Sequence, residues 1–397
     1  MLGIITEYNP FHNGHKIHID KSKEKTKSES CIVVMSGNFT QRGELAIFDK
    51  YTRTKMALLN GADIVLELPL CFATASAELF SLGAVDILNK TGIVKNICFG
   101  SEKGEIKSFL EVANVLSNEP IAFKENLNNF LKEGLSFPKA RLKALEKFLN
   151  KDISFLKEPN NILSIEYLKA INKLNSNILV ETIKREKVDF HSNNICGDVA
   201  SATAIRYAIL NGKFNEIKNV VPKNCFYIIK ENFKYVPKID DYTEILKYIL
   251  KTNTPEYIKN IADITEGLEN KIIDNINSEN ITQLIEKIKS KRYTYTKLQR
   301  AILHIILNVT KEDESYLRKN LNPYIRVLGF KKSSSHLLKE LTENAKVPVI
   351  TNLKNAKDIL DNKALYFLQK EIVSTDIYYL KENKKNNQEY KMPLVIV

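Results

Sequence analysis

Five short apolar runs mark the first half of the chain, and they limit its possible folds more than any other feature. Each run is rich in isoleucine and valine and is apolar at consecutive positions, which is typical of strands buried on both faces. They cover residues 2–6, 31–36, 63–68, 96–100 and 178–184. Helical patterns lie between them, at residues 49–60, where Asp49 can act as the N-cap, and at residues 73–90. This alternation predicts an α/β fold with a Rossmann-like parallel sheet, which binds ligands at the carboxyl ends of its strands.

The second half of the chain is rich in lysine, asparagine and isoleucine, with apolar residues at helical spacing. A length of 397 residues exceeds one ordinary core. We therefore expect an α/β domain over residues 1–212 and a mostly α-helical domain over residues 213–397. Short strands are predicted at 325–330 and 347–350. The polar stretch 381–391 is predicted to be mobile or a surface loop.

The charge of the chain favours a polyanionic partner. Its formal net charge is +12 and its isoelectric point is near 9.1, which suits nucleic acid; the alternative is a lysine-rich surface without such a partner. Five cysteines without a CxxC pair indicate buried reduced thiols. Polar residues interrupt the first apolar run too early for a signal peptide, and no run of about 18 apolar residues occurs. We expect a cytoplasmic protein without a membrane segment.

Three of the six histidines follow the first predicted strand, in the stretch EYNPFHNGHKIH (7–18). Asn13 and Gly14 can open a helix, which would place His12 and His15 at its N-terminus, where unpaired N–H groups and the helix dipole favour an anion. Gly14 lets a phosphate or a flat ring approach the backbone. Imidazoles at such a site can donate hydrogen bonds to a phosphate during in-line attack. His18 by itself suits a wall or packing role at least as well as a catalytic one.

Zinc is the alternative ligand for the three imidazoles. Histidines at i, i+3 and i+6 drift by about 60° per step around a helix, so they do not converge on one ion. No cysteine or further carboxylate nearby completes tetrahedral spacing. The sequence therefore predicts no metal centre here.

Two short motifs resemble those of a known superfamily. HNGH (12–15) resembles the HxGH signature of the adenylyl- and cytidylyltransferases, and ASATAIR (200–206) resembles their Ser/Thr-rich phosphate-binding segment. The two motifs bracket the α/β half in the expected order. This resemblance implies a nucleotidyltransferase domain that binds ATP.

Longer stretches narrow the resemblance to one family. GIITEYNPFHNGH, VVMSGNFTQRGE, FDKYTRTKMALLNGADIVLELP, FGSE and PNNILSIEYLKA together resemble the bacterial tRNA(Met) cytidine acetate ligases. The family's reaction implies three substrates: ATP, acetate and elongator tRNA(Met). Acetyl-adenylate forms with release of pyrophosphate, and the acetyl group passes to N4 of the wobble cytidine. The first domain would be catalytic and the second would bind tRNA, and Mg²⁺ is expected to accompany ATP.

The matching motifs imply the site residues. His12 and His15 would be catalytic. The residues implied for ATP binding are Ile5, Thr6, Glu7, Tyr8, Asn9, Pro10, Phe11, His12, Asn13, Gly14, His15, Lys16, Ile17, His18, Gly100, Asn160, Arg185, Ser201, Thr203 and Arg206. Asn161 is a one-place alternative to Asn160. Ser201 and Thr203 could instead only cap a helix.

Two further stretches are candidates for contact with the substrates or with tRNA. In residues 37–58 the candidates are Gln41, Arg42, Lys50 and Arg53, with a solvated loop and an amphipathic helix as the alternative. In residues 287–300 they are Lys291 and Arg292, beside Tyr293 and Tyr295, which could stack on bases. The alternative there is a lysine-rich helix start with exposed tyrosines.

Two other functions remain open from the sequence. The first is a small-molecule nucleotidyltransferase of the same fold, and the second is an RNA-binding protein with a degenerate nucleotide site. The large basic second half argues against the first, which needs no surface for a polyanion. The intact HNGH and ASATAIR motifs argue against the second.

Overall fold

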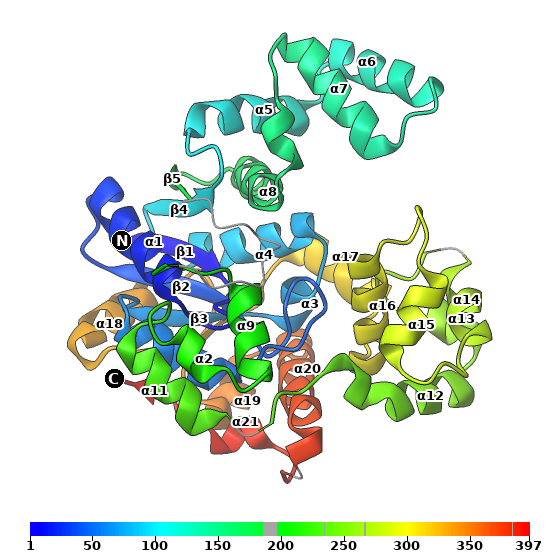
Figure 1. The fold of residues 1–397 in the computed structure, drawn as a ribbon. Helices are drawn as coiled ribbons and strands as arrows, with labels where there is room; N and C mark the ends of the chain where they lie inside the picture. The colour runs from blue at the N-terminus through cyan, green and yellow to red at the C-terminus, as the bar shows by residue number, and fades with distance from the viewer. Residues whose placement is uncertain (186–196, 234, 266, 383) are drawn as a thin grey trace.

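The computed structural model describes residues 1–185, 197–233, 235–265, 267–382 and 384–397. A single sheet of eight strands runs through it (Figure 1). The strands are β1 (Leu2–Thr6), β2 (Cys31–Ser36), β3 (Ile64–Leu68), β4 (Asn96–Ser101), β5 (Leu179–Lys184), β6 (Ile325–Phe330), β7 (Val349–Ile350) and β8 (Val395–Ile396). The five strands predicted in the first half are confirmed to within one residue at each end.

The order of the strands locates the ligand-binding edge of the sheet. They run β5-β4-β1-β2-β3-β6-β7, and β8 pairs with β6 beside this path. All pairs from β5 to β3 are parallel. From β1 the chain first adds β2 and β3 on one side and then β4 and β5 on the other. The direction of winding therefore reverses between β1 and β4, and the carboxyl ends there form the crevice in which such sheets bind ligands.

Both faces of the central strands are buried, because successive side chains point to opposite sides. In β2, Ile32 and Val34 belong to the core that includes α4 (Ala77–Lys90). Cys31, Val33 and Met35 belong to a second core with α2 (Lys50–Leu59) and α11 (Lys223–Asn232). This two-sided burial explains why the runs are apolar at consecutive positions.

The helices of the first half follow the predictions closely. The helix expected at 49–60 is α2, and Asp49 caps it by accepting hydrogen bonds from the N–H groups of Tyr51 and Thr52 at 2.9 Å each. The helix expected at 73–90 is divided, because α4 begins only at Ala77. The other helices of this half are α1 (Asn13–Thr26), α2 (Lys50–Leu59), α3 (Leu70–Ala73), α5 (Ile106–Asn118), α6 (Ile121–Lys132), α7 (Phe137–Leu149), α8 (Pro159–Lys173) and α9 (Ala202–Leu210).

A helical extension between β4 and β5 was not predicted. Helices α6 and α7 pair with each other and project from the sheet beyond α5 and α8 (Figure 1). They share a small separate core with α5 and α8, which includes Phe109, Val112, Phe123 and Leu145.

The second half is mostly helical, as expected, and its chain also returns to the sheet. Its helices are α10 (Phe214–Ile217), α11 (Lys223–Asn232), α12 (Thr243–Thr252), α13 (Pro255–Lys259), α14 (Leu268–Asp274), α15 (Ile281–Ile288), α16 (Tyr295–Leu307), α17 (Lys311–Asn320), α18 (Ser335–Asn344), α19 (Ala356–Ile359), α20 (Asn362–Tyr378) and α21 (Gln388–Lys391). Strand β6 pairs antiparallel with β3 and carries β7 and β8. The sheet therefore extends across the expected boundary at residue 212.

The polar stretch 381–391 was predicted to be mobile or a surface loop, and this is wrong for Gln388 and Glu389. Helix α21 places Gln388 and Glu389 in the interior, where Glu389 is only 1% exposed. The charged partners that hold Glu389 come from distant parts of the chain, so local composition did not reveal its burial.

Candidate active site

The first helix begins at the predicted pair of histidines. His12 is the N-cap of α1, and its backbone N–H donates a hydrogen bond to Nδ1 of His15 at 3.3 Å. The two rings are stacked with centroids 3.7 Å apart, and the ring of Tyr8 meets that of His15 edge-on at 4.7 Å. Because Nδ1 of His15 accepts a hydrogen bond, its proton is on Nε2. His15 therefore holds an N–H donor in a fixed orientation.

All three imidazoles of this segment are neutral near pH 7. Burial lowers the pKa of His12 to about 3 and that of His18 to about 4, and it also lowers the pKa of His15. The positive charge of Arg185 lowers all three pKa values further. Neutral imidazoles next to fixed cations make a positive site that retains N–H donors, which suits an anion.

His18 differs from the other two histidines. It donates a hydrogen bond to the backbone of Phe99, and its buried Nε2 has no partner among the described residues. Nε2 is therefore an acceptor, which fits a hydroxyl of a ligand better than a phosphate oxygen.

The two motifs at opposite ends of the α/β half meet at the start of α1. The Asn13 side chain donates hydrogen bonds to the carbonyl oxygens of Asp198 and Asn219, at 2.9 and 2.8 Å. A Cβ atom at Gly14 would lie 2.9 Å from Cε1 of His12 and 3.5 Å from Val199. Gly14 is thus needed for close packing between the imidazole and the segment before α9.

Helix α9 brings its arginine to the same place. Arg206 donates a hydrogen bond to the carbonyl of Asn9 at 3.0 Å, and its charge contributes to the lowered pKa of His12. The hydroxyl of Ser201 accepts the N–H of Ala204 at 3.1 Å, which is the capping role left open by the sequence. Thr203 is exposed and lies 3.4 Å from Arg206.

The ends of β4 and β5 form the other side of the crevice. A Cβ atom at Gly100 would lie 3.1 Å from Cγ of Arg185, so the glycine makes room for this arginine beside β4. Asn160, in the first turn of α8, donates a hydrogen bond to the Glu102 carboxylate at 2.6 Å. Asn161 is fully buried and bonds to the backbone of Glu102 and Phe155. Asn161 therefore has a structural role, and Asn160 stays the asparagine predicted to bind ATP.

The remaining residues predicted to bind ATP lie on β1, on the segment after it and on α1. Tyr8, Asn9, Pro10 and Phe11 are buried, Ile5, Thr6, Glu7 and Ile17 are half-buried, and Lys16 is exposed. Lys16 pairs with Asp20 at 2.8 Å. The Asn9 side chain accepts the N–H of Ile47 at 2.8 Å, which makes it an anchor between loops.

The loop of residues 37–46 connects the crevice to the helical half. Glu7 accepts the backbone N–H of Gln41 at 2.7 Å, and Glu44 lies 3.5 Å from Arg206. Gly43 has a φ of +78°, and a Cβ there would lie 2.8 Å from the backbone nitrogen of Arg300 in α16. Gln41 is half-buried and Arg42 is exposed at the tip of this loop. Their contact with the substrates or with tRNA stays a prediction.

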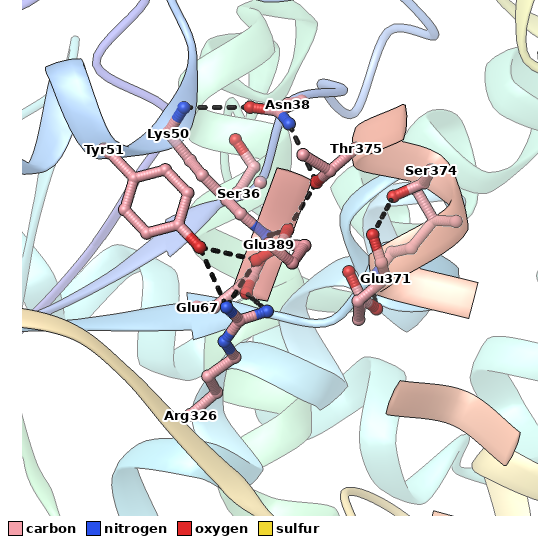
Figure 2. A network of polar contacts seen from close by, with 12 residues as sticks. Ser36, Asn38, Lys50, Tyr51, Glu67, Arg326, Glu371, Ser374, Thr375 and Glu389 are labelled. Atoms are coloured by element: carbon pink, nitrogen blue, oxygen red, sulfur yellow. Dashed lines mark hydrogen bonds and ion pairs between the residues drawn. The ribbon is translucent and has the colours of Figure 1, made fainter. Parts of the chain in front are cut away.

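Lys50 and Arg53 were predicted to contact substrate or tRNA, and their burial contradicts this. Lys50 is 1% exposed and forms ion pairs with Glu67 and Glu389 (Figure 2). Arg53 is fully buried, and its guanidinium donates to the carbonyl oxygens of Glu7, Ser36, Gly37 and Phe48. Both side chains thus hold the strand ends and loops from within. The partners arise from tertiary packing and were not visible in the local pattern.

The network around Lys50 also supports the loop at the site. Arg326 of β6 pairs with Glu67 at 3.2 Å and with Glu389, so carboxylates and cations alternate in the interior (Figure 2). The side chain of Asn38 accepts the N–H of Lys50 at 2.8 Å and donates to Thr375 at 3.1 Å. The C-terminal helices are therefore connected to the first residues of the loop 37–46.

The candidate RNA contacts before α16 divide into exposed and buried residues. Lys291 and Arg292 are exposed, as a contact with tRNA requires. Tyr293 is only 2% exposed and packs in the core, so the expectation that it stacks on a base is wrong. Tyr295 is half-buried.

Two negative findings apply to the described residues. They contain no group of three or more His, Cys, Asp or Glu side chains that could hold a metal ion. None of the helices in the described ranges is long and apolar enough to cross a membrane.

One residue beside Asn160, Glu102, was not singled out in the sequence, although the quoted motif FGSE contains it.

The crevice at the winding reversal and the paired histidines at the start of α1 define a nucleotidyltransferase of the HxGH class. In agreement, residues 1–392 match the HIGH Nucleotidyl Transferase family. The chain is 43% identical to a tRNA(Met) cytidine acetate ligase of Clostridium perfringens and 38% identical to one of Halothermothrix orenii, and each alignment covers 100% of this chain and 99% of the relative. This chain belongs to the tRNA(Met) cytidine acetate ligase family.

Solved structures show the same fold. The structure is similar to that of Thermotoga maritima TmcAL in its apo form, with a TM-score of 0.94 and 31% identity over 100% of this chain and 99% of that one. It is also similar to the same protein bound with alpha-thio ATP, with a TM-score of 0.93 and 30% identity at the same coverage.

Proposed function

We propose that this protein is an ATP-dependent acetate ligase that acetylates N4 of the wobble cytidine of elongator tRNA(Met) in the cytoplasm. The observation that carries this proposal is the stacked pair His12 and His15 at the start of α1, within the fields of two arginines. The family to which the chain belongs supports the identity of the acceptor.

The site can promote the first step by stabilising charge. An acetate oxygen attacks the α-phosphorus of ATP, the bond to the bridging oxygen breaks, and pyrophosphate leaves. Nε2–H of His15 would donate to an α-phosphate oxygen on which negative charge increases. The guanidinium groups of Arg185 and Arg206 would attract the phosphates. Because the imidazoles are neutral beforehand, the site needs no proton transfer before it binds ATP.

Mg²⁺ would supply further charge neutralisation for the departing pyrophosphate. Among the described residues no cluster of carboxylates or imidazoles suits a resident ion, so the ion would be held mainly by ATP phosphate oxygens and water.

In the second step the N4 amine attacks the acetyl carbonyl carbon. The bond to the phosphate oxygen breaks, AMP leaves and N4 loses a proton. Gln41 and Arg42, on the loop 37–46 that packs against α16, would form the wall that the cytidine meets. The exposed Lys291 and Arg292 would contact the tRNA backbone from the helical half.

Acetate-dependent exchange of pyrophosphate into ATP tests the first step, and transfer of labelled acetate to tRNA(Met) tests the second. We expect exchange without tRNA and label in N4-acetylcytidine after nuclease digestion. Pyrophosphate release that requires a phosphorylated small molecule rather than acetate would instead indicate a small-molecule nucleotidyltransferase.

A further inference from the structure

Three lysines form a stripe along one side of α7. Lys139, Lys143 and Lys147 are all exposed and lie four residues apart. Four residues turn a helix by about 400°, so each lysine is displaced by only about 40° from the one before, and the three span about 12 Å along the axis. The stripe therefore presents its ammonium groups on one face.

This stripe is not neutralised within the protein. Among the residues that the structure describes, no carboxylate lies within ion-pair distance of Lys139, Lys143 or Lys147. Nearby lysines of the same extension do have acidic partners, since Lys151 pairs with Glu111 at 2.7 Å and Lys124 with Glu119 at 3.6 Å. Like charges at i and i+4 repel, so the stripe is a feature that a bound polyanion would stabilise.

The packing of α7 gives the stripe a defined position. Ala144 and Leu145 lie in the small core of the extension, and the ammonium of Lys143 lies over the ring of Phe130, 5.6 Å from its centroid. The stripe thus lies on a helix that is packed against α6, the helix that carries Phe130.

The chain leads directly from the stripe to the candidate active site. After α7 it passes one 3₁₀ turn at Ser154–Lys157 and enters α8, whose first turn places Asn160 against Glu102. Helices α12–α16, with the exposed Lys291 and Arg292 in the loop before α16, lie on a different side of the sheet from α6 and α7 (Figure 1). A large polyanion that reaches the crevice could therefore meet basic surfaces on two sides.

We propose that Lys139, Lys143 and Lys147 bind the phosphate backbone of the RNA acceptor. The tRNA would then contact both the extension between β4 and β5 and the helical half. This inference rests on the proposed function. It assigns part of the tRNA surface to α7, whereas the sequence placed the tRNA-binding domain after residue 212 and named candidate contacts before it only in residues 37–58.

The test compares three triple variants of the full-length chain. In K139A/K143A/K147A the charge is removed, and in K139R/K143R/K147R it is kept. The control K339A/K354A/K357A removes three exposed lysines beside β7, at the opposite edge of the sheet from β5. Circular dichroism checks that each variant is folded, and the readouts are the Kd for tRNA(Met) at several salt concentrations and the KM and kcat of acetyl transfer.

We expect the alanine variant to bind tRNA about tenfold or more weakly, with the log–log salt slope reduced by about 2. Its KM for tRNA should rise while kcat and acetate-dependent pyrophosphate exchange stay unchanged, and the arginine variant and the control should resemble the wild type. An unchanged Kd and slope in the alanine variant would overturn the proposal, and so would an equal loss in the control. Wild-type protein without acetate-dependent exchange would contradict the proposed function itself, which is a separate readout.

Discussion

Two replacements of His15 distinguish its two nitrogen atoms. Nδ1 accepts the backbone N–H of His12, and Nε2 carries the proton that would reach the phosphate. In His15→Asn the side-chain oxygen can replace Nδ1 as acceptor, but no donor reaches as far as Nε2. In His15→Gln the amide nitrogen can extend to the position of Nε2. The first variant should therefore keep the start of α1 and lose the chemistry, and the second should keep part of the chemistry.

The expected magnitude follows from what each variant removes. Loss of one preorganised donor to a transition state costs about 10²- to 10³-fold in rate, or about 3–4 kcal/mol. His15→Asn should lower adenylate formation by this factor, and His15→Gln by about tenfold. The lost ring contacts with Tyr8 and His12 should cost only about 1 kcal/mol of folding free energy in either variant. ATP affinity should change by less than about fivefold, since the donor acts mainly in the transition state.

Acetate-dependent pyrophosphate exchange gives the rate, calorimetry gives the Kd for ATP, and urea unfolding gives the folding free energy. Equal exchange rates in the asparagine variant and the wild type would refute the role of Nε2–H. A loss of ATP binding as large as the loss of rate would show that His15 serves binding rather than catalysis.

Three other outcomes follow from the structure. Lys50→Met should lower the free energy of unfolding by about 3–5 kcal/mol in urea titrations, because it leaves the two buried carboxylates of Glu67 and Glu389 to share the single cation of Arg326. The free protein should lose stability as the pH falls from about 6.5 to 4. The pKa values of His12 and His18 are lowered to about 3 and 4 in the folded protein, so the unfolded chain binds protons first. Each histidine contributes up to about 1.4 kcal/mol per pH unit to this loss, which unfolding at several pH values would measure. Gly43→Ala should slow acetyl transfer at least tenfold more than pyrophosphate exchange, because its Cβ would displace the loop from Arg300.

The central sheet could be predicted from the sequence because its signal is local. A strand buried on both faces must be apolar along its whole length, and each of the five runs satisfies this within about six residues. The carboxyl ends of β1 and β4 lie at the same edge of such a sheet, and this arrangement predicts that His12 and Gly100 lie near each other. The resemblance to a known family supplied the individual residues, since nothing in the local pattern distinguishes Asn160 from Asn161.

Features that depend on distant partners could not be predicted. The strand β6 was predicted, but its antiparallel pairing with β3, more than two hundred residues away, has no mark in the local sequence. Lys50 and Arg53 look like surface charges on an amphipathic helix, and only the return of β6 and α21 buries the first of them. The helix pair α6 and α7 was not predicted, although its sequence has apolar residues at helical spacing.

The same distant contacts also join the two halves of the chain near the proposed active site. The motifs proposed to bind ATP lie before residue 212, yet the loop 37–46 beside them is held by Thr375 from α20 and packs against α16. Glu389 and Arg326 complete the ion network around Lys50 and Glu67, so the first half alone would keep only the Lys50–Glu67 pair of that network. Removing partners from a buried ion network costs several kcal/mol, a large part of the stability of a domain. The proposed active site therefore depends on both halves of the chain, and the helical half contacts it through the loop 37–46.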